Sequence, residues 1–325
     1  MWWLVAFYMP ALPYWFWSYQ KKAEISDHLI ERSLLLAIIE YFTVGFLGAL
    51  IGSMVGLGGG FLIVPFLLIV MSFLPATVAG TSILVVFVTA VISVSQYARH
   101  HLIDWKLGGV FAGFSIPGAV IGALITGDIQ TGLFMQIFAA DLLLVAGYIL
   151  FRPSRSLNIA CAKQLQGVVH VKPSTANPDG LAAYAINLPL AAIVFFLAGM
   201  LSGLVGVGGG SVMVPGMLLV LDMPAAMVAS TSMLVMVFNA GVASIVQAAL
   251  EHINWTAAIL LSLGAIVGSR IGPHVSVRLN KSQLTRLMSI VLLVTAVTVL
   301  YLSLPNETYV KSCCNGTGTR MTRGL

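Results

Sequence analysis

Long runs of apolar residues separated by short polar connections make up most of this chain. In a helix that rises 1.5 Å per residue, about 20 apolar residues cross the hydrocarbon core of a bilayer. Two groups of five runs are seen, at 34–55, 61–74, 77–98, 107–126 and 132–151, and at 185–207, 211–221, 226–248, 256–274 and 284–303. The pattern predicts an all-α polytopic membrane protein.

The two groups share residues at a constant offset of 150. The matches include glycines, a proline, hydroxyl residues and a tryptophan, which apolar composition alone would not bring into register. We therefore predict two homologous halves. The matched pairs are Gly56 and Gly206, Gly58–Gly60 and Gly208–Gly210, Pro65 and Pro215, Ala79 and Ala229, Thr81 and Thr231, Ser82 and Ser232, Ile103 and Ile253, Trp105 and Trp255, Gly118 and Gly268, and Gly122 and Gly272.

These runs divide the chain into five parts. The polar stretch in the middle contains basic residues and turn formers, which indicates a solvated cytoplasmic linker. The parts are an aromatic N-terminal segment (1–33), a first half (34–151), the linker (152–184), a second half (185–303) and a C-terminal tail (304–325).

The runs 61–74 and 211–221, which follow the glycines, are short. They would reach only about 21 and about 17 Å as helices, less than the roughly 30 Å core. We therefore predict about four transmembrane helices in each half, with a short re-entrant or broken helix per half. Parallel halves are preferred because most basic connections then lie in the cytoplasm, although Arg278 and Lys281 do not. In the alternative, every run crosses and the two halves, of five helices each, are inverted.

Composition agrees with the membrane class, because 8% of residues are charged and 59% are hydrophobic. Soluble domains carry about 25% charged residues, so a soluble globular protein is excluded. The net charge of +5 comes from basic residues in the connections, so it does not indicate a nucleic-acid partner. Three cysteines (Cys161, Cys313 and Cys314) lack metal-ligand spacing. We expect no metal and no cofactor.

The glycine runs are the first candidate site. Each has four glycines in five positions and a proline five residues later, which favours a break in the helix. A helix that restarts there presents free amides and the positive end of its dipole, so Gly58–Gly60 and Gly208–Gly210 are candidates for binding a small anion. Tight helix packing is the alternative, and it is the reading preferred for Gly118 and Gly122.

The hydroxyl pairs Thr81–Ser82 and Thr231–Ser232 are the second candidate. Such side chains usually bond to their own helix backbone, but their recurrence suggests that they donate to an oxyanion. Gln96, Asn239 and Gln247 are further uncharged donors. Gln96 and Gln247 are equivalent only if the offset slips by one residue.

Charged residues inside apolar runs are costly and are functional by default. Asp141 is close to mid-membrane in its run and has no acidic counterpart, because position 291 is valine. It is a candidate for proton coupling or for an ion pair. Arg270 either attracts the anion or extends to the interface, whereas Glu40 is interpreted as interfacial. His100, His101 and His252 are expected at solvated connections. No HExxH motif or other catalytic motif is present, so no catalytic residue and no enzyme activity are predicted.

The paired motifs resemble the sulfite exporter TauE/SafE family. The resemblance rests on Gly-x-Gly-Gly-Gly-x4-Pro at Gly56–Pro65 and Gly206–Pro215, on Ala-x-Thr-Ser at Ala79–Ser82 and Ala229–Ser232, and on Asp104–Trp105 and Asn254–Trp255. It covers roughly 34–303. It departs from strict symmetry at Gly80, which stands opposite Ser230.

This resemblance implies a multi-pass protein of the cell membrane, a secondary transporter that exports a small anion such as sulfite, a sulfonate or another organic acid by alternating access. The expected partners are the small anion and the lipid bilayer, with no nucleic acid. Two other functions are considered, an anion channel and a membrane binding or assembly protein that transports nothing. Substrate, direction of transport, coupling ion and oligomeric state are left open.

Overall fold

A computed structural model of the chain describes residues 27–99, 103–151, 168–171, 184–220 and 225–278. The aromatic N-terminus before residue 27, most of the linker, the last predicted helix (284–303) and the C-terminal tail lie outside the described residues. Contacts divide the chain into two units, Met1–Tyr41 and Phe42–Leu325. Of the first unit the structure describes only 27–41, the beginning of helix α3.

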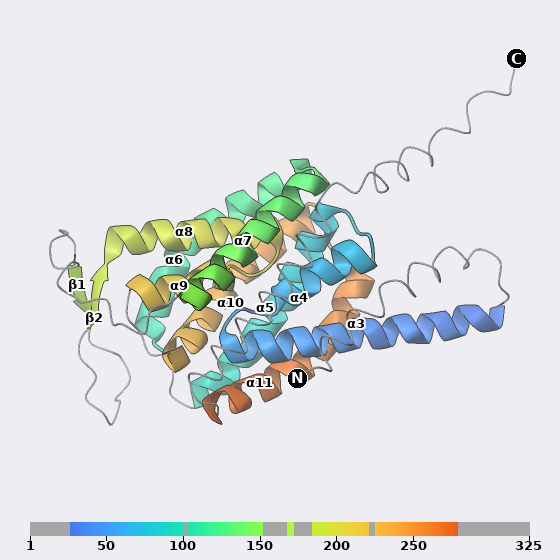
Figure 1. The fold of residues 1–325 in the computed structure, drawn as a ribbon, viewed down its shortest axis with the longest axis horizontal. Coiled ribbons are helices and arrows are strands. Elements are labelled where there is room, and N and C mark those ends of the chain that lie inside the picture. The colour runs from blue at the N-terminus through green and yellow to red at the C-terminus, as the bar shows by residue number, and fades with distance from the viewer. Residues whose placement is uncertain (1–26, 100–102, 152–167, 172–183, 221–224, 279–325) are drawn as a thin grey trace, which may run out of the picture. The chain divides into compact units, whose positions relative to one another are not determined.

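The described chain is almost entirely helical, as predicted (Figure 1). A two-stranded antiparallel sheet, in which Val168 of the linker pairs with Asn187 at the start of the predicted second half, was not predicted. The elements are α3 (Asp27–Val55), α4 (Gly60–Pro65), the π-helical turn η1 (Phe66–Val70), α5 (Pro75–Arg99), α6 (Trp105–Ile125), the 3₁₀ turn η2 (Thr126–Asp128), α7 (Thr131–Phe151), β1 (Val168–Val171), β2 (Tyr184–Asn187), α8 (Leu188–Val205), α9 (Gly210–Val220), α10 (Ala225–Ala249) and α11 (Trp255–Arg278).

Six described helices are long and apolar enough to cross a membrane. The chain is therefore a multi-pass membrane protein, as predicted. The candidate spans are Leu36–Val55, Pro75–Arg99, Trp105–Asp128, Leu188–Val205, Met227–Ala249 and Trp255–Ser276. Eight crossings stay a prediction, because Thr131–Leu143 is a shorter apolar helix and the run 284–303 is not described.

Both predicted helix breaks are present. Helix α3 ends at Val55 and α4 begins at Gly60, and α8 ends at Val205 before α9 begins at Gly210. The glycines in the breaks have backbone φ values from 73° to 93°, a region that residues with a Cβ rarely adopt. They are Gly56, Gly58, Gly59, Gly206, Gly208 and Gly209.

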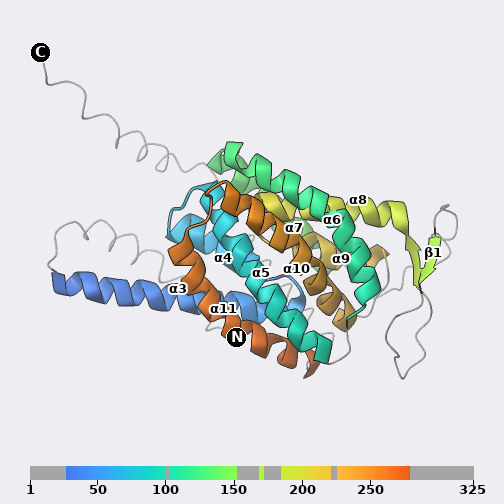
Figure 2. The same ribbon diagram turned by 180° about the vertical axis from the view of Figure 1, so that it is seen from behind.

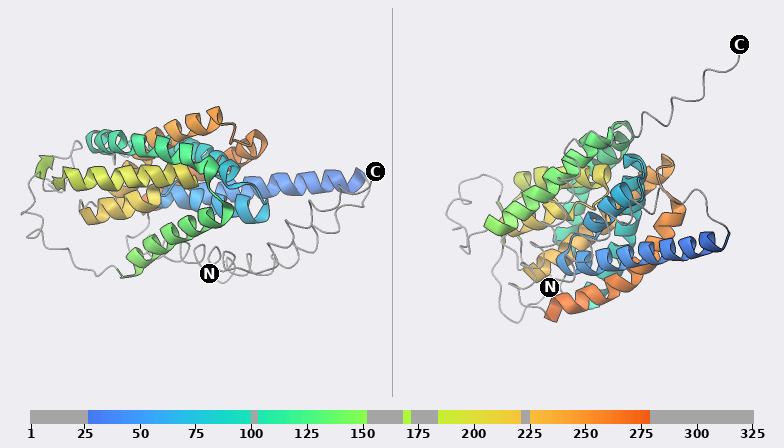
Figure 3. Two further views of the ribbon diagram at one scale, coloured as in Figure 1. Left: turned by 90° about the horizontal axis from the view of Figure 1, so that it is seen from above. Right: turned by 45° about the vertical axis from the view of Figure 1, so that its right-hand side comes forward.

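Small residues let helices α6 and α8 lie in close contact, side by side in the views of Figures 1 and 3. A Cβ at Gly118 would overlap the carbonyl oxygen of Phe196, and one at Gly122 would overlap that of Met200. The expected packing role of Gly118 and Gly122 is thereby confirmed.

Helices α3 and α11 are in close contact in the same way, at the residues that match those of the α6–α8 contact at the offset of 150. A Cβ at Gly268 would overlap the carbonyl oxygen of Phe46, and one at Gly272 would lie 2.6 Å from that of Leu50. In both helix pairs, the residue numbers of the contacting residues increase together along the two helices. Helix α6 is therefore parallel to α8, and α3 is parallel to α11.

The first helices of the two halves, α3 and α8, run in opposite directions, as Figures 1 and 2 show. The contacts agree, because Gly127 at the end of α6 lies against the ring of His252, just before α11 begins. Helices α6 and α11 are thus antiparallel, and so are their partners α8 and α3. The preference for parallel halves was wrong.

The reason is a reversal of the chain at the first break. Gly59 lies against Gly52, and Ile63 lies against Gly48, so α4 returns alongside the end of α3. The hydroxyl of Tyr97, near the end of α5, donates to the carbonyl of Ser53, near the end of α3, at 2.8 Å. Helices α3 and α5 therefore run the same way, and the order of the following helices is inverted.

Candidate anion-binding site

The two breaks, here called the first glycine loop (Gly56–Gly59) and the second glycine loop (Gly206–Gly209), lie against each other. A Cβ at Gly60 would be 2.6 Å from the Cα of Val207, and a Cβ at Gly210 would be 2.7 Å from the carbonyl oxygen of Gly56. All residues of both loops are buried. The backbones touch because glycine leaves no side chain between them.

A serine on α5 holds the second glycine loop, and a serine on α10 holds the first. The hydroxyl of Ser82 on α5 lies 3.0 Å from the carbonyl oxygen of Gly206, and that of Ser232 on α10 lies 2.9 Å from the carbonyl oxygen of Gly56. Each hydroxyl also lies near a carbonyl of its own helix, at 3.2 Å for Ser82 and 3.0 Å for Ser232. The predicted oxyanion donors therefore donate to carbonyls in this conformation.

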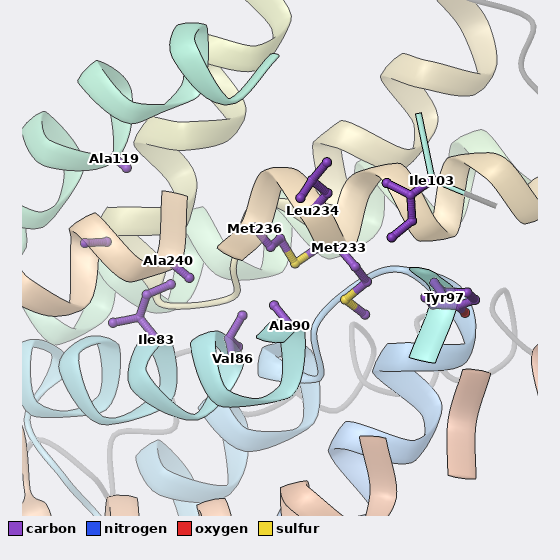
Figure 4. Close-up of a cluster of buried hydrophobic side chains, with 11 residues drawn as sticks. Ile83, Val86, Ala90, Tyr97, Ile103, Ala119, Met233, Leu234, Met236 and Ala240 are labelled. Atoms are coloured by element: carbon purple, nitrogen blue, oxygen red, sulfur yellow. The ribbon is translucent and has the colours of Figure 1, made fainter. Parts of the chain in front are cut away.

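Two apolar side chains, Val86 on α5 and Met236 on α10, fill the space beside both loops. A Cβ at Gly58 would be 2.8 Å from Val86 Cγ1 and 2.9 Å from Met236 Sδ, and a Cβ at Gly208 would meet the same two side chains. Both belong to a buried apolar cluster between α5 and α10 (Figure 4). The loops are thus closed off by apolar packing.

Some backbone N–H groups in the loops and in the first turn of the helices that follow donate hydrogen bonds, and others do not. The Gly58 N–H donates to the carbonyl of Gly52 at 3.3 Å. Among the described residues, the N–H groups of Gly60, Phe61, Gly210 and Ser211 make no hydrogen bond. Amides of the first helical turn have no partner within their own helix, so the start of each short helix presents two buried donors.

The threonines of the predicted pairs differ in their contacts. Thr81 Oγ1 accepts a hydrogen bond of 3.0 Å from the amide of Asn254, which caps α11 through its own side chain. Thr231 Oγ1 is buried and unpartnered. Thr81 thus positions the start of α11, whereas Thr231 has a polar group available.

Gln247 stabilises the end of α8. Its amide nitrogen donates to the carbonyl of Gly203 at 3.2 Å, and its amide oxygen lies 2.6 Å from Nδ1 of His252. Tyr97 binds the carbonyl of Ser53, which is 150 positions before Gly203. The counterpart of Gln247 is therefore Tyr97. Gln96, its neighbour, is buried near the end of α5.

Asp141 and Arg270 are not brought together. Arg270 lies on the exposed face of α11, whereas Asp141 on α7 is 8% exposed and faces the Ser211 hydroxyl at the start of α9. Neither Asp141 Oδ1 nor Ser211 Oγ has a hydrogen-bond partner. Among the described residues, no ion pair joins Asp141 to Arg270, and no group of three His, Cys, Asp or Glu side chains could hold a metal ion.

Two further buried polar side chains have unpartnered atoms near these loops or beside Met236. Ser202 is fully buried, and its Cβ would lie 3.2 Å from a Cβ placed on Gly209. Asn239, one turn after Met236, has neither its amide nitrogen nor its oxygen satisfied. A buried unpaired polar group costs about 1–3 kcal/mol. The sequence pointed to Asn239 but not to Ser202, whose only signal is its replacement of Gly52 at the offset of 150.

Comparison with known proteins gives consistent results. The chain is 27% identical to the Probable membrane transporter protein YunE of Bacillus subtilis (strain 168), over 82% of this chain and 98% of that protein. It is 25% identical to a Probable membrane transporter protein of Methanocaldococcus jannaschii, over 81% and 95% of the two chains, and 26% identical to one of Xylella fastidiosa (strain Temecula1), over 84% and 97%. No solved structure matches the chain.

A family model described as sulfite exporter TauE/SafE matches residues 41–299, which include both glycine loops and every described helix from α4 onward. The family match and the names of the relatives both agree with the apolar, membrane-spanning helices described above. The chain is a membrane transporter and belongs to the sulfite exporter TauE/SafE family.

Proposed function

We propose that this chain is a secondary transporter of the cell membrane that exports a small anion such as sulfite, a sulfonate or another organic acid. The observation that carries the proposal is the contact between the two glycine loops, where Gly60, Phe61, Gly210 and Ser211 present free buried amides. Free amides of this kind bind anions without a charged side chain.

The proposed binding site comprises Gly58–Gly60, Gly208–Gly210, Thr81, Ser82, Thr231 and Ser232. Gln96 and Gln247, in the last turns of α5 and α10, lie outside it. Val86 and Met236 would have to leave the loops before an anion could reach the amides. Ser82 and Ser232 would then exchange their loop carbonyls for oxygens of the anion.

The contact pattern also supports the proposed duplication and an alternating-access mechanism. Residues 150 positions apart make matching contacts in helices that run in opposite directions, and many secondary transporters are built from inverted repeats with a central site. Movement of one half against the other would open the loops first to one side of the membrane and then to the other.

Flux into proteoliposomes tests the proposal. The full chain is reconstituted, and uptake of radiolabelled sulfite, methanesulfonate, sulfate and acetate is compared in the wild type, Gly59→Ala and Gly209→Ala. At φ values of 88° and 73° an added Cβ is strained by about 1–2 kcal/mol. We expect flux to fall by about tenfold or more. Gly109→Ala is the matched control, because a Cβ there meets nothing within 4 Å.

The outcomes separate the rival functions. Saturable flux that is lost in both loop variants supports the transporter. Flux that never saturates and follows only the electrochemical gradient indicates an anion channel instead. If correctly inserted wild-type protein moves none of these anions, or if both loop variants transport normally, the proposed site is wrong.

A further inference from the structure

In the described part of the chain, three buried polar side chains with unpartnered oxygens lie around the second glycine loop. Asp141, Ser202 and Ser211 are at least nine-tenths buried, and each has a side-chain oxygen without a hydrogen-bond partner. The residues 150 positions away from them are Val291, Gly52 and Phe61, none of which is polar. The three polar residues therefore have no polar counterpart at the offset of 150.

These groups converge on the start of α9. Ser211 is the second residue of this helix, Ser202 lies beside Gly209, and the Asp141 carboxyl faces the Ser211 hydroxyl from α7. The free amides of Gly210 and Ser211 lie at the same place. A carboxylate and a transported anion are attracted to the same donors, and they repel each other when both are charged.

Among the residues that the structure describes, no other ionisable group lies on the helices in main contact with α7. The two helices that pack against α7 in the described chain, α8 and α9, contain no acidic, basic, tyrosine or cysteine residue. On α7 itself the other titratable residue is Tyr148, two turns farther along. Within the described part of the chain, Asp141 is therefore the ionisable group that faces the start of α9.

We propose that Asp141 carries the coupling proton, and that its ionised carboxylate competes with the transported anion for the second glycine loop. This inference rests on the proposed function. A proton from water converts the carboxylate to a neutral carboxylic acid, and the anion then occupies the Gly210 and Ser211 amides. On the other side the anion leaves and the proton returns to water, which regenerates the carboxylate. Each cycle moves one proton with one monovalent anion, and the outward concentration gradient of the anion, not the proton gradient, then drives its export.

Binding as a function of pH tests the competition. Methanesulfonate is the probe, because it stays a monovalent anion throughout, and its Kd for the solubilised full chain is measured by calorimetry at about pH 5.5 and about pH 8.5. In the wild type the Kd should rise by up to about tenfold per pH unit once Asp141 is ionised, since one proton is linked to one anion. In Asp141→Asn it should be independent of pH. A wild-type Kd that is equal at both pH values overturns the inference without any variant.

Proton movement provides a second, independent readout. In proteoliposomes that contain a pH-sensitive dye, a methanesulfonate gradient should acidify the compartment into which the anion moves. Asp141→Asn should carry the anion without acidification, whereas Asp128→Asn, which removes an exposed carboxylate, should acidify as the wild type does. Acidification by Asp141→Asn at the wild-type rate overturns the inference and leaves the proposed function intact. Absence of methanesulfonate binding and flux in the wild type overturns both.

Discussion

At the residue scale, the two serines that cross between the halves have the clearest structural role. Ser82 and Ser232 lie at matching positions, and each donates to the first carbonyl of the opposite loop. A hydroxyl with one hydrogen shared between two carbonyls can change partner with little motion. The same side chains are therefore suited to holding the closed loops and to binding an oxyanion afterwards.

Replacing either serine should destabilise the closed state. Ser82→Ala and Ser232→Ala each leave a buried loop carbonyl with one hydrogen bond fewer, at a cost of about 1 kcal/mol in the free energy of unfolding. Thermal unfolding in detergent should show a lower Tm for each variant. Ser95→Ala is the control, because this exposed serine bonds only to Ile92 of its own helix at 2.6 Å. Equal Tm values for all three variants would contradict the assigned role.

The chemistry of single residues was partly predictable from the sequence. The recurrence of Ser82 and Ser232 identified the two side chains but not their acceptors, since only the inverted packing places each opposite a loop carbonyl. For Gln96 and Gln247, the shared residue type suggested an equivalence that the structure does not support. In the structure Tyr97 performs the task of Gln247, because a phenol hydroxyl and an amide N–H can both reach the corresponding carbonyl.

At the scale of elements, glycine does two different things in this fold. In the loops it allows positive φ, whereas in α6, α8 and α11 it lets two backbones approach within the width of a side chain. Spacing in the sequence separated these uses correctly. The dense runs followed by proline broke the helix, and the pairs four residues apart packed against a neighbour.

Two glycines of α6 provide a matched test of the packing. Gly122→Ala places a Cβ onto the carbonyl of Met200, so α6 and α8 must separate, and we expect a loss of about 1–3 kcal/mol in stability. Gly113→Ala meets nothing within 4 Å and should be neutral or stabilising by up to about 1 kcal/mol, because alanine favours a helix. Thermal unfolding of the two variants side by side measures the difference. A Gly122→Ala protein as stable as Gly113→Ala would mean that the two helices are not in close contact.

The direction of the elements was not predictable in the same way. A run of apolar residues has the same composition whether the chain crosses, returns or stops halfway, and charge counting favoured parallel halves. The deciding interaction is the return of α4 along the end of α3, with Gly59 against Gly52. This contact depends on three-dimensional packing that no local pattern encodes.

At the scale of the whole membrane-embedded unit, the inverted packing places basic residues at one end of the helices and acidic residues at the other. Arg99, Lys106 and Arg278 lie at one end of the helix layer, because Tyr97 and Ser276 both contact the end of α3. Asp128 and Glu251 lie at the other end, beside Gly127 and His252. Arg278, an exception when the halves were taken as parallel, now joins the other basic residues.

Cysteine labelling in intact cells should reveal this orientation. Basic connections are retained in the cytoplasm, so Lys106→Cys should be shielded from an impermeant maleimide while Asp128→Cys is labelled. Both positions are exposed at opposite ends of α6, and Cys161, Cys313 and Cys314 are first replaced by serine. Labelling at 106 and protection at 128 would reverse the orientation, and permeabilised cells, in which both sites should react, provide the control.

The two side chains that pack beside both glycine loops, Val86 and Met236, differ in stiffness, although they occupy matching positions. Val86 has one side-chain torsion with a strongly preferred rotamer in a helix, whereas Met236 is unbranched with three rotatable bonds. Rotation within Met236 alone can uncover Gly58 and Gly208, whereas Val86 leaves them only if helix α5 shifts. Opening of the site should therefore begin with Met236, so one pair of unlike residues at matching positions gives two similar loops a preferred first movement.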